Sequence, residues 1–248
     1  MSNDARFDEY RRRFLGGTAT AVTGLAIAPG VMLHQVAEAR PADQPVTSDV
    51  RWGMLIDTNK CSNGCNACVT ACNDEHGLTG HGRPESDAQW IRKVELRDKQ
   101  TGNTQSLPLL CQHCEKPPCV DVCPTGASFR RVDGIVLVDK HICIGCRYCM
   151  MACQYKSSSF IHEDMQDQLP HAPRGKGTVE SCTFCVHRVD NGRTPACVEA
   201  CSAENHNAMV FGDMNDPDSE ISQQLEKYSS RQIRADLQLN TGVRYRGI

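Results

Sequence analysis

The feature that most constrains this chain is its sixteen cysteines, which fall into four sets of four. Cysteines only a few residues apart rarely meet disulfide geometry with one another, and small disulfide scaffolds spread their cysteines along the chain. The grouping favours metal ligation and leaves disulfides as a weaker alternative. The sets are Cys61, Cys65, Cys68 and Cys72; Cys111, Cys114, Cys119 and Cys123; Cys143, Cys146, Cys149 and Cys153; and Cys182, Cys185, Cys197 and Cys201.

Composition agrees with a fold that depends on metal. The chain has 248 residues, of which only 5% are aromatic, and its mean hydropathy is −0.45. The apolar core is therefore thin, and bound metal is expected to supply much of the stability. The net charge is −3 and no stripe of lysine and arginine stands out, so no nucleic-acid partner is predicted.

The first 39 residues resemble a twin-arginine signal peptide. Residues 11–15 read RRRFL, residues 16–33 are weakly apolar, and residues 37–39 form a small-x-small cleavage site before Arg40. A basic cluster before a surface helix and a retained membrane anchor are the alternatives. The twin-arginine route exports folded proteins, often with their cofactor inside. The leader thus predicts a periplasmic protein that is loaded with metal before export and is at most peripheral to the membrane.

The four cysteine sets show an internal repeat. The stretches MLIDTNKCSNGCNACVTAC and IVLVDKHICIGCRYCMMAC both begin with an apolar run and both carry an aspartate, Asp57 or Asp139, four residues before the first cysteine. We expect these aspartates to cap the turns into the cysteine loops. The second and fourth sets also share a pattern, since both open with C-x2-C. The order A, B, A′, B′ indicates a duplicated unit of two motifs.

Local patterns predict an α+β chain of short strands and helices. Three residues separate the third and fourth cysteines of each set, which suits a short helix. The polar tail over 229–248 is expected to lie on the surface or on a partner. The other predicted elements are strands at 54–56 and 135–138, a hairpin over 90–110 that turns near 101–103, and a helix over 219–228 capped by Ser219.

The spacing within the sets separates iron–sulfur clusters from zinc. C-x2-C-x2-C places three thiolates on one tight loop, which suits the corner of a cubane. In two-cluster ferredoxins the fourth cysteine ligates the other cluster and is followed by proline, as Pro124 follows Cys123. Sixteen thiols with none left over therefore predict four [4Fe–4S] clusters. Zinc, which also accepts four cysteines, remains an alternative here.

At this point the motifs resemble a known family. CIGCRYCMMAC, CQHCEKPPCVDVCPTGA, CTFCVHRVDNGRTPACVEAC and VFGDMNDPDSEIS are similar to the four-cluster iron–sulfur subunits of the molybdopterin-oxidoreductase and polysulfide-reductase type. The resemblance covers most of residues 50–220. The extra residue between Cys61 and Cys65, together with the leader, makes the chain most similar to a periplasmic ferredoxin-like subunit of a membrane complex in dissimilatory sulfur metabolism. The sequence departs from the family where Asn73, Gln154 and Ser202 replace a frequent proline.

The resemblance also implies which cysteines share a cluster. Iron would be bound only through the sixteen cysteines, and His113 and His187, which lie beside them, are expected to be surface or supporting residues. The implied ligand sets are Cys61, Cys65, Cys68 and Cys201 for cluster 1; Cys182, Cys185, Cys197 and Cys72 for cluster 2; Cys111, Cys114, Cys119 and Cys153 for cluster 3; and Cys143, Cys146, Cys149 and Cys123 for cluster 4.

The expected fold is a pair of interleaved, duplicated 2[4Fe–4S] ferredoxin-like units. Residues 40–104 and 168–214 would form the first unit, residues 105–167 the second, and residues 215–248 a C-terminal helix and tail. No phosphate loop, catalytic triad or zincin motif is present. No catalytic site is therefore expected in the chain itself.

The expected function is electron transfer through four clusters within an oxidoreductase complex. The resemblance implies two partners, an integral membrane subunit that interacts with quinone and a multihaem cytochrome c. The first alternative is the electron-transfer subunit of a molybdopterin-dependent respiratory reductase, whose motifs are the same. The second, from another class, is a structural zinc-binding protein of the periplasm.

Overall fold

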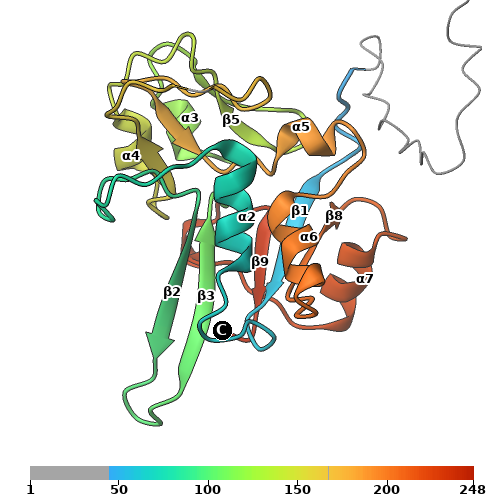
Figure 1. Cartoon of the computed structure of the whole chain (residues 1–248). Helices are drawn as coiled ribbons and strands as arrows, with labels where there is room; N and C mark the ends of the chain where they lie inside the picture. The colour runs from blue at the N-terminus through green and yellow to red at the C-terminus, as the bar shows by residue number, and fades with distance from the viewer. Residues whose placement is uncertain (1–44, 167) are drawn as a thin grey trace, which may run out of the picture. The chain divides into compact units, whose positions relative to one another are not determined.

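The computed structural model describes residues 45–166 and 168–248, so the predicted signal peptide lies outside the described residues. The described residues belong to one compact unit of short strands and helices (Figure 1). The strands are β1 (Trp52–Asp57), β2 (Ile91–Arg97), β3 (Thr104–Leu110), β4 (Ser128–Arg130), β5 (Val136–Val138), β6 (Ser158–Phe160), β7 (Val179–Ser181), β8 (Met209–Asp213) and β9 (Val243–Arg246). The helices are α2 (Ala67–His76), α3 (Pro118–Asp121), α4 (Tyr148–Ala152), α5 (Val186–Val189), α6 (Ala196–Ala203), α7 (Glu220–Lys227) and the 3₁₀ turn η2 (Ala235–Leu237).

One sheet has three strands in the order β8-β1-β9. The middle strand β1 pairs antiparallel with β8 and parallel with β9. Its apolar run is buried on both faces, with Met54 and Ile56 fully inaccessible. A short apolar run covered on both sides is the expected pattern for such a strand. The predicted strand at 54–56 is therefore confirmed.

The C-terminal tail does not lie on the surface as predicted. Its strand β9 completes the central sheet, and Val243 and Tyr245 are fully buried. The Tyr245 hydroxyl donates to the carbonyl oxygen of Pro108 at 3.1 Å and accepts from Nε2 of Gln112 at 3.1 Å. The tail reads as polar because arginines alternate with these two residues. That alternation is itself the period of a strand with one buried face.

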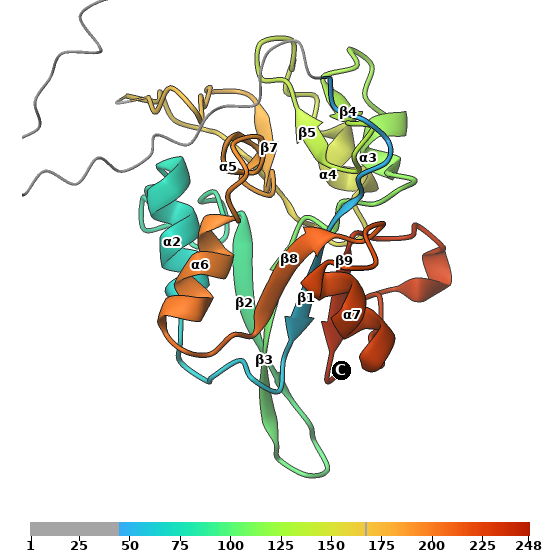
Figure 2. The same ribbon diagram turned by 90° about the vertical axis from the view of Figure 1, so that its right-hand side faces the viewer.

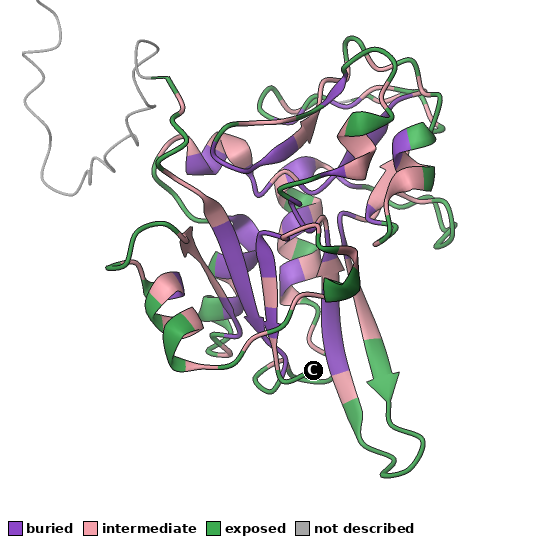
Figure 3. Cartoon of the chain, turned by 180° about the vertical axis from the view of Figure 1, so that it is seen from behind, coloured by how far each residue is buried: buried purple, intermediate pink, exposed green. Residues whose placement is uncertain are grey.

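The predicted hairpin is confirmed as β2 and β3. Its register runs from Ile91 opposite Leu110 to Arg97 opposite Thr104. Gly102 lies in the turn with a φ of 73°, a left-handed conformation that glycine adopts without strain. The end near the core is buried, whereas the far end is exposed to solvent (Figure 3).

Each cysteine set ends in a short helix, as its spacing predicts. Helix α2 packs along α6, and α3 packs against α4 (Figures 1 and 2). The outer two motifs of the sequence are thus paired, and so are the inner two. This pairing is the arrangement that the interleaved fold requires, although the exact unit boundaries stay a prediction.

Helix α7 begins where the sequence predicts. The hydroxyl of Ser219 accepts a hydrogen bond from the backbone N–H of Ser222 at 3.2 Å, which makes Ser219 the N-cap. The helix packs on β8 and β1. Over residues 45–166 and 168–248, no helix has both the length and the apolar character needed to cross a membrane.

Candidate metal centre

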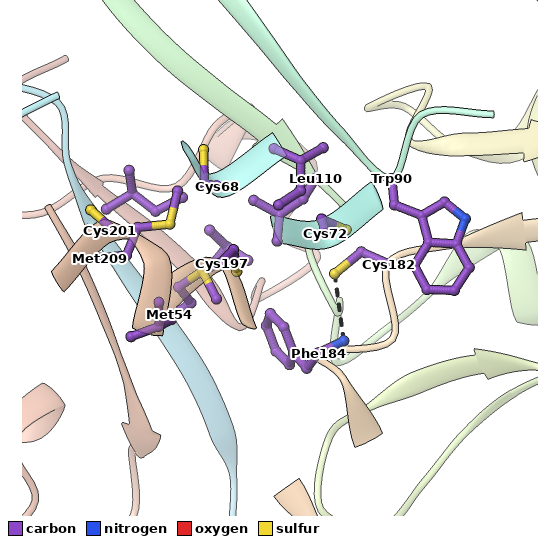
Figure 4. Packing of buried hydrophobic residues seen from close by; sticks show 14 of the residues in the cluster. Met54, Cys68, Cys72, Trp90, Leu110, Cys182, Phe184, Cys197, Cys201 and Met209 are labelled. Atoms are coloured by element: carbon purple, nitrogen blue, oxygen red, sulfur yellow. Dashed lines mark hydrogen bonds between the residues drawn. The ribbon is translucent and has the colours of Figure 1, made fainter. Parts of the chain in front are cut away.

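All sixteen cysteines lie in the described part of the chain, and none of them forms a disulfide. Five of the twenty residues of the main apolar core are cysteines. Figure 4 shows several of them among Met54, Leu110 and Phe184. A core with this many cysteines indicates that a group bound by their thiols is part of the core. The five are Cys68, Cys72, Cys182, Cys197 and Cys201.

The first group of neighbouring thiols joins the first cysteine set to the last cysteine of the chain. Burial, together with the nearby thiols of Cys61, Cys201 and Cys65, raises the pKa of Cys68 to about 11. Burial also raises the pKa of Cys61, with Cys201 and Cys65 adding to the effect. Helices α2 and α6 bring these residues together from opposite ends of the described chain.

The second group shows the reverse exchange, because Cys72 of the first set lies with three cysteines of the fourth set. Burial raises the pKa of Cys182 well above its ordinary value, and Cys72, Cys197 and Cys185 raise it further. All four of these cysteines are buried. This group therefore lies deepest in the molecule.

The third group combines the second set with Cys153 of the third set. Burial raises the pKa of Cys114 to about 12, and Cys119 and Cys153 contribute next. Burial also raises the pKa of Cys111, and Cys119, Cys153 and Cys114 add to the rise. A hydrogen bond from the backbone of His113 acts against it. The α3–α4 pair positions this group.

The fourth group is the most exposed. Burial raises the pKa of Cys149 to about 11, with further contributions from Cys119, Cys143 and Cys123. Cys146 is the one exposed cysteine of the sixteen and is not among the thiols that act on Cys149. The structure thus brings together three members of this predicted ligand set and leaves Cys146 at the surface.

These groups fit iron–sulfur clusters. A buried thiol with a raised pKa stays protonated unless a metal stabilises its thiolate, since the thiolate is the form that binds metal. Backbone N–H groups already point at several sulfurs, as cluster sites require. Ser128 donates to Cys123 at 3.3 Å, and Phe184 donates to Cys182 at 3.4 Å (Figure 4). The assignment of each cysteine to one cluster stays a prediction.

His76 is a residue of the site that the cysteine spacing did not reveal. Its side chain is 2% exposed, and its Nε2 lies 3.3 Å from Sγ of Cys185. Burial lowers the pKa of His76 to about 3, so the ring is neutral. A thiolate can only accept, so Nε2 carries the proton and donates to the sulfur. The only available signal was its place one helical turn after Cys72.

Replacing His76 with phenylalanine is expected to lower the reduction potential of the cluster that Cys185 helps to bind. The N–H group favours the more negative, reduced form, and its loss at about 1 kcal/mol corresponds to a shift on the order of 50 mV. Redox titration followed by electron paramagnetic resonance measures this shift. Trp90→Phe is the matched control, because Trp90 packs on the His76 ring at 4.2 Å without bonding the sulfur. Equal potentials in both variants would contradict the assignment.

His113 joins two cysteine loops. It is 2% exposed, its Nδ1 accepts the backbone N–H of Val136 at 3.0 Å, and its ring stacks on Phe184 at 3.6 Å. His113 and Phe184 each precede the second cysteine of a C-x2-C motif, and both have a positive φ. Equivalent positions of the repeat thus meet between the second and third thiol groups. A supporting role of His113 toward a cluster stays a prediction.

Glycine is required in one cysteine loop for a steric reason. Gly64 and Gly145 occupy equivalent positions of the repeat, and both have a positive φ. A Cβ on Gly64 would meet open space, whereas a Cβ on Gly145 would overlap the carbonyl oxygen of Gly177. The two positions therefore share backbone strain but differ in packing.

Substituting alanine at Gly145 is expected to disrupt the loop of Cys143 and Cys146 and to lower the iron content by about four atoms per chain. Gly64→Ala is the control, since it carries only the left-handed backbone penalty of about 1–2 kcal/mol. Iron and protein assays on anaerobically purified variants compare the two. The packing argument is wrong if both variants lose the same amount of iron.

The two repeated aspartates have the role predicted for them. Asp57 Oδ1 accepts from the backbone N–H of Asn59 at 3.1 Å, and Asp139 Oδ1 accepts from that of His141 at 2.8 Å. Both are Asx turns that lead into a cysteine loop. His187 is also not among the thiol groups, and its Nε2 lies 2.7 Å from Glu75.

The fold and the thiol groups define a ferredoxin-like protein, and comparisons with known proteins agree. A family model described as a 4Fe-4S dicluster domain matches residues 103–214, and a second model with the same description matches residues 58–127. The chain is 39% identical to the Hdr-like menaquinol oxidoreductase iron-sulfur subunit 1 of Archaeoglobus fulgidus, over 95% of this chain and 97% of that protein.

Two further relatives extend the comparison. A tetrathionate reductase subunit of Salmonella typhimurium is 35% identical over 92% of this chain and 83% of its own length. Protein NrfC of Escherichia coli is 38% identical over 88% of this chain and 86% of its own length. The chain therefore belongs to the family of iron–sulfur subunits with 4Fe-4S dicluster domains that includes these proteins. Its cysteines bind 4Fe-4S clusters, which overturns the zinc alternative.

Proposed function

We propose that this protein is a periplasmic electron-transfer subunit with four [4Fe–4S] clusters in a row, of the DsrO type found in the DsrMKJOP complex of sulfur metabolism. The observation that carries the proposal is that cysteines of different motifs lie close together, as Cys201 does to Cys68, Cys72 to Cys182, Cys153 to Cys114 and Cys123 to Cys149. When bound, such a cluster accepts and donates one electron. The chain's part is to hold the clusters close together and to set their potentials.

Contacts between the groups support a fixed order of clusters. Cys68 of the first group lies close enough to Cys72 and Cys197 of the second group to contribute to their raised pKa. The stack of His113 on Phe184 connects the second group to the third. Cys119 of the third group contributes to the raised pKa of Cys149 in the fourth group, which connects these two groups. The groups therefore follow one another as clusters 1, 2, 3 and 4, with clusters 1 and 4 at the ends.

The end with cluster 4 is proposed to bind the integral membrane, quinone-linked subunit. Among residues 45–166 and 168–248, seven of the nine exposed large apolar side chains lie in residues 122–151, in the half that carries α3, α4 and β5 (Figure 1). This stretch, here called the apolar segment, also contains the exposed Cys146. Exposed apolar side chains that flank a cluster loop in sequence, as Ile142, Ile144 and Tyr148 do, suit a stable protein interface. The seven are Val122, Phe129, Val132, Ile142, Ile144, Tyr148 and Met151.

The end with cluster 1 is proposed to face a soluble partner such as a multihaem cytochrome c. Its loop is polar and partly accessible, with Ser62, Asn63 and Asn66 between the cysteines. Lys93 donates to the carbonyl oxygen of Ser62 at 2.6 Å. A polar surface with a lysine beside a cluster suits a transient encounter that is steered by charge.

The relatives support a membrane complex and also keep the alternative open. One of them is named as a subunit of a menaquinol oxidoreductase, which favours a quinol-linked partner for this chain. Another is named as a subunit of tetrathionate reductase, which favours the electron-transfer subunit of a respiratory reductase. The predicted leader favours the periplasm in either case.

Purification of the tagged protein from native membranes under anaerobic conditions tests the proposal, with mass spectrometry of the co-purifying subunits. A polytopic quinone-type subunit with a multihaem cytochrome c is the expected result. A large molybdopterin protein instead would move the function to a respiratory reductase. Recovery of the protein alone in the soluble periplasm would contradict a membrane complex.

A charged substitution in the apolar segment is expected to break the membrane contact. Ile144 is 67% exposed, so Ile144→Glu leaves the core intact but buries a charge in the interface. We expect recovery of the membrane subunit to fall by about tenfold or more. Leu96→Glu, at a residue 46% exposed on β2, is the matched control. Equal recovery with both variants would place the membrane partner elsewhere.

A further inference from the structure

We propose that Glu75, His171 and His187 form a second metal site, separate from the cluster cysteines, that binds one zinc-like divalent cation. Each residue offers one ligand atom, and these atoms all lie within 4.8 Å of one another. The proposal does not depend on the electron-transfer role. It concerns side chains that are not predicted to bind a cluster, although His187 lies within the fourth cysteine motif.

The ligand types suit zinc. Two imidazoles and one carboxylate are a common zinc donor set, with a fourth position left for water. Nε2 of His187 lies 2.7 Å from Oε1 of Glu75. Histidine binds metal through its neutral ring, in which one nitrogen keeps a lone pair. A cation between the two side chains takes the lone pair of Nε2 while the ring proton moves to Nδ1.

The surroundings hold the ligands in place. Nη1 of Arg188 donates to the second carboxylate oxygen of Glu75 at 2.7 Å, a contact typical of the residues that orient metal-bound carboxylates. Nε2 of His171 lies 2.8 Å from the backbone oxygen of Glu75, and the two histidine rings lie 4.4 Å apart. Arg188 also forms an ion pair with Glu199, which offsets its charge.

The site joins three segments that are distant in sequence. Glu75 lies near the end of α2, His187 lies in α5, and His171 lies in the connection between β6 and β7. His187 is two residues after Cys185. A cation at this point would hold the segment between β6 and β7 close to the second thiol group, which contains Cys185. Its role would be to connect α2, α5 and the segment between β6 and β7.

The test is titration of zinc chloride into the anaerobically purified holoprotein by calorimetry, after dialysis against a mild chelator. We expect one zinc per chain and zinc-edge X-ray absorption with two imidazole ligands. His171→Ala is expected to weaken binding by about tenfold or more, while His162→Ala, at another exposed histidine, leaves it unchanged. Iron content and absorbance near 400 nm verify that the clusters remain intact in each variant.

Two outcomes would overturn the proposal. One is the absence of stoichiometric zinc binding to the wild-type holoprotein. The other is equal affinity in His171→Ala and wild type, which would mean adventitious binding only. Glu75→Gln supplies an independent variant, since it keeps the size of the side chain and removes its charge. Loss of zinc affinity in both variants with full iron content would support the site.

Discussion

Replacement of Cys201 by serine is expected to remove the cluster held by Cys61, Cys65 and Cys68, although Cys201 belongs to the last cysteine set. Cys201 contributes to the raised pKa of Cys61 and Cys68, whereas the thiols that contribute at Cys182, a member of its own set, are Cys72, Cys197 and Cys185. Loss of one cubane removes about four of about sixteen iron atoms per chain. Iron analysis and electron paramagnetic resonance of the reduced protein measure the loss.

Double variants distinguish the crossed scheme from an uncrossed one. If Cys61 and Cys201 serve one cluster, the variant with both changed to serine loses no more iron than either single variant. Changing Cys201 together with Cys182 is expected to lose twice as much. The reverse result would show that each set binds its own cluster. Ser202→Ala, at an exposed neighbour on α6, is the control for changes to the helix.

The local parts of the fold were predictable because their signals are short-range. The apolar run at Met54 and Ile56, the hairpin from Ile91 to Leu110, and the cap at Ser219 all follow from patterns within a few residues. Strand β9 was missed because its arginines made the tail look polar. Its place beside β1 depends on a parallel pairing with the other end of the described chain, which no local pattern encodes.

The same limit applies to the metal centre. Spacing predicts four sets of thiols, since one loop must present three sulfurs to a cubane. Spacing says nothing about which set supplies the fourth ligand, because that depends on the packing of α2 on α6 and of α3 on α4. His76, Glu75 and His171 were missed for a related reason. They are polar residues whose importance comes only from what the fold places beside them.

Removal of the iron is expected to abolish cooperative folding of the protein. Cys68, Cys72, Cys182, Cys197 and Cys201 lie within the main core, and loss of the clusters would leave a cavity lined by thiols at its centre. Cavities of even one side chain cost about 2–5 kcal/mol, which approaches the total stability of a typical domain at about 5–15 kcal/mol.

The short elements of the chain cannot offset that loss. Helices α3 and α5 have four residues each and α4 has five, far below the length at which an isolated helix is stable in water. The sheets β4-β5 and β6-β7 have two strands each, and such pairs are marginal alone. We therefore expect these elements to depend on the 4Fe-4S clusters that the cysteines bind.

The measurement is circular dichroism during anaerobic destruction of the clusters with an oxidant and chelator, followed by thermal unfolding. We expect the far-ultraviolet signal to fall with the absorbance near 400 nm, and the metal-free protein to show no cooperative transition. Reconstitution with iron and sulfide should restore both signals and serves as the control. A metal-free protein that still unfolds cooperatively would contradict the argument. It would mean that the central sheet of β8, β1 and β9, with Tyr245 and Ile56 fully buried in it, is sufficient to fold the chain.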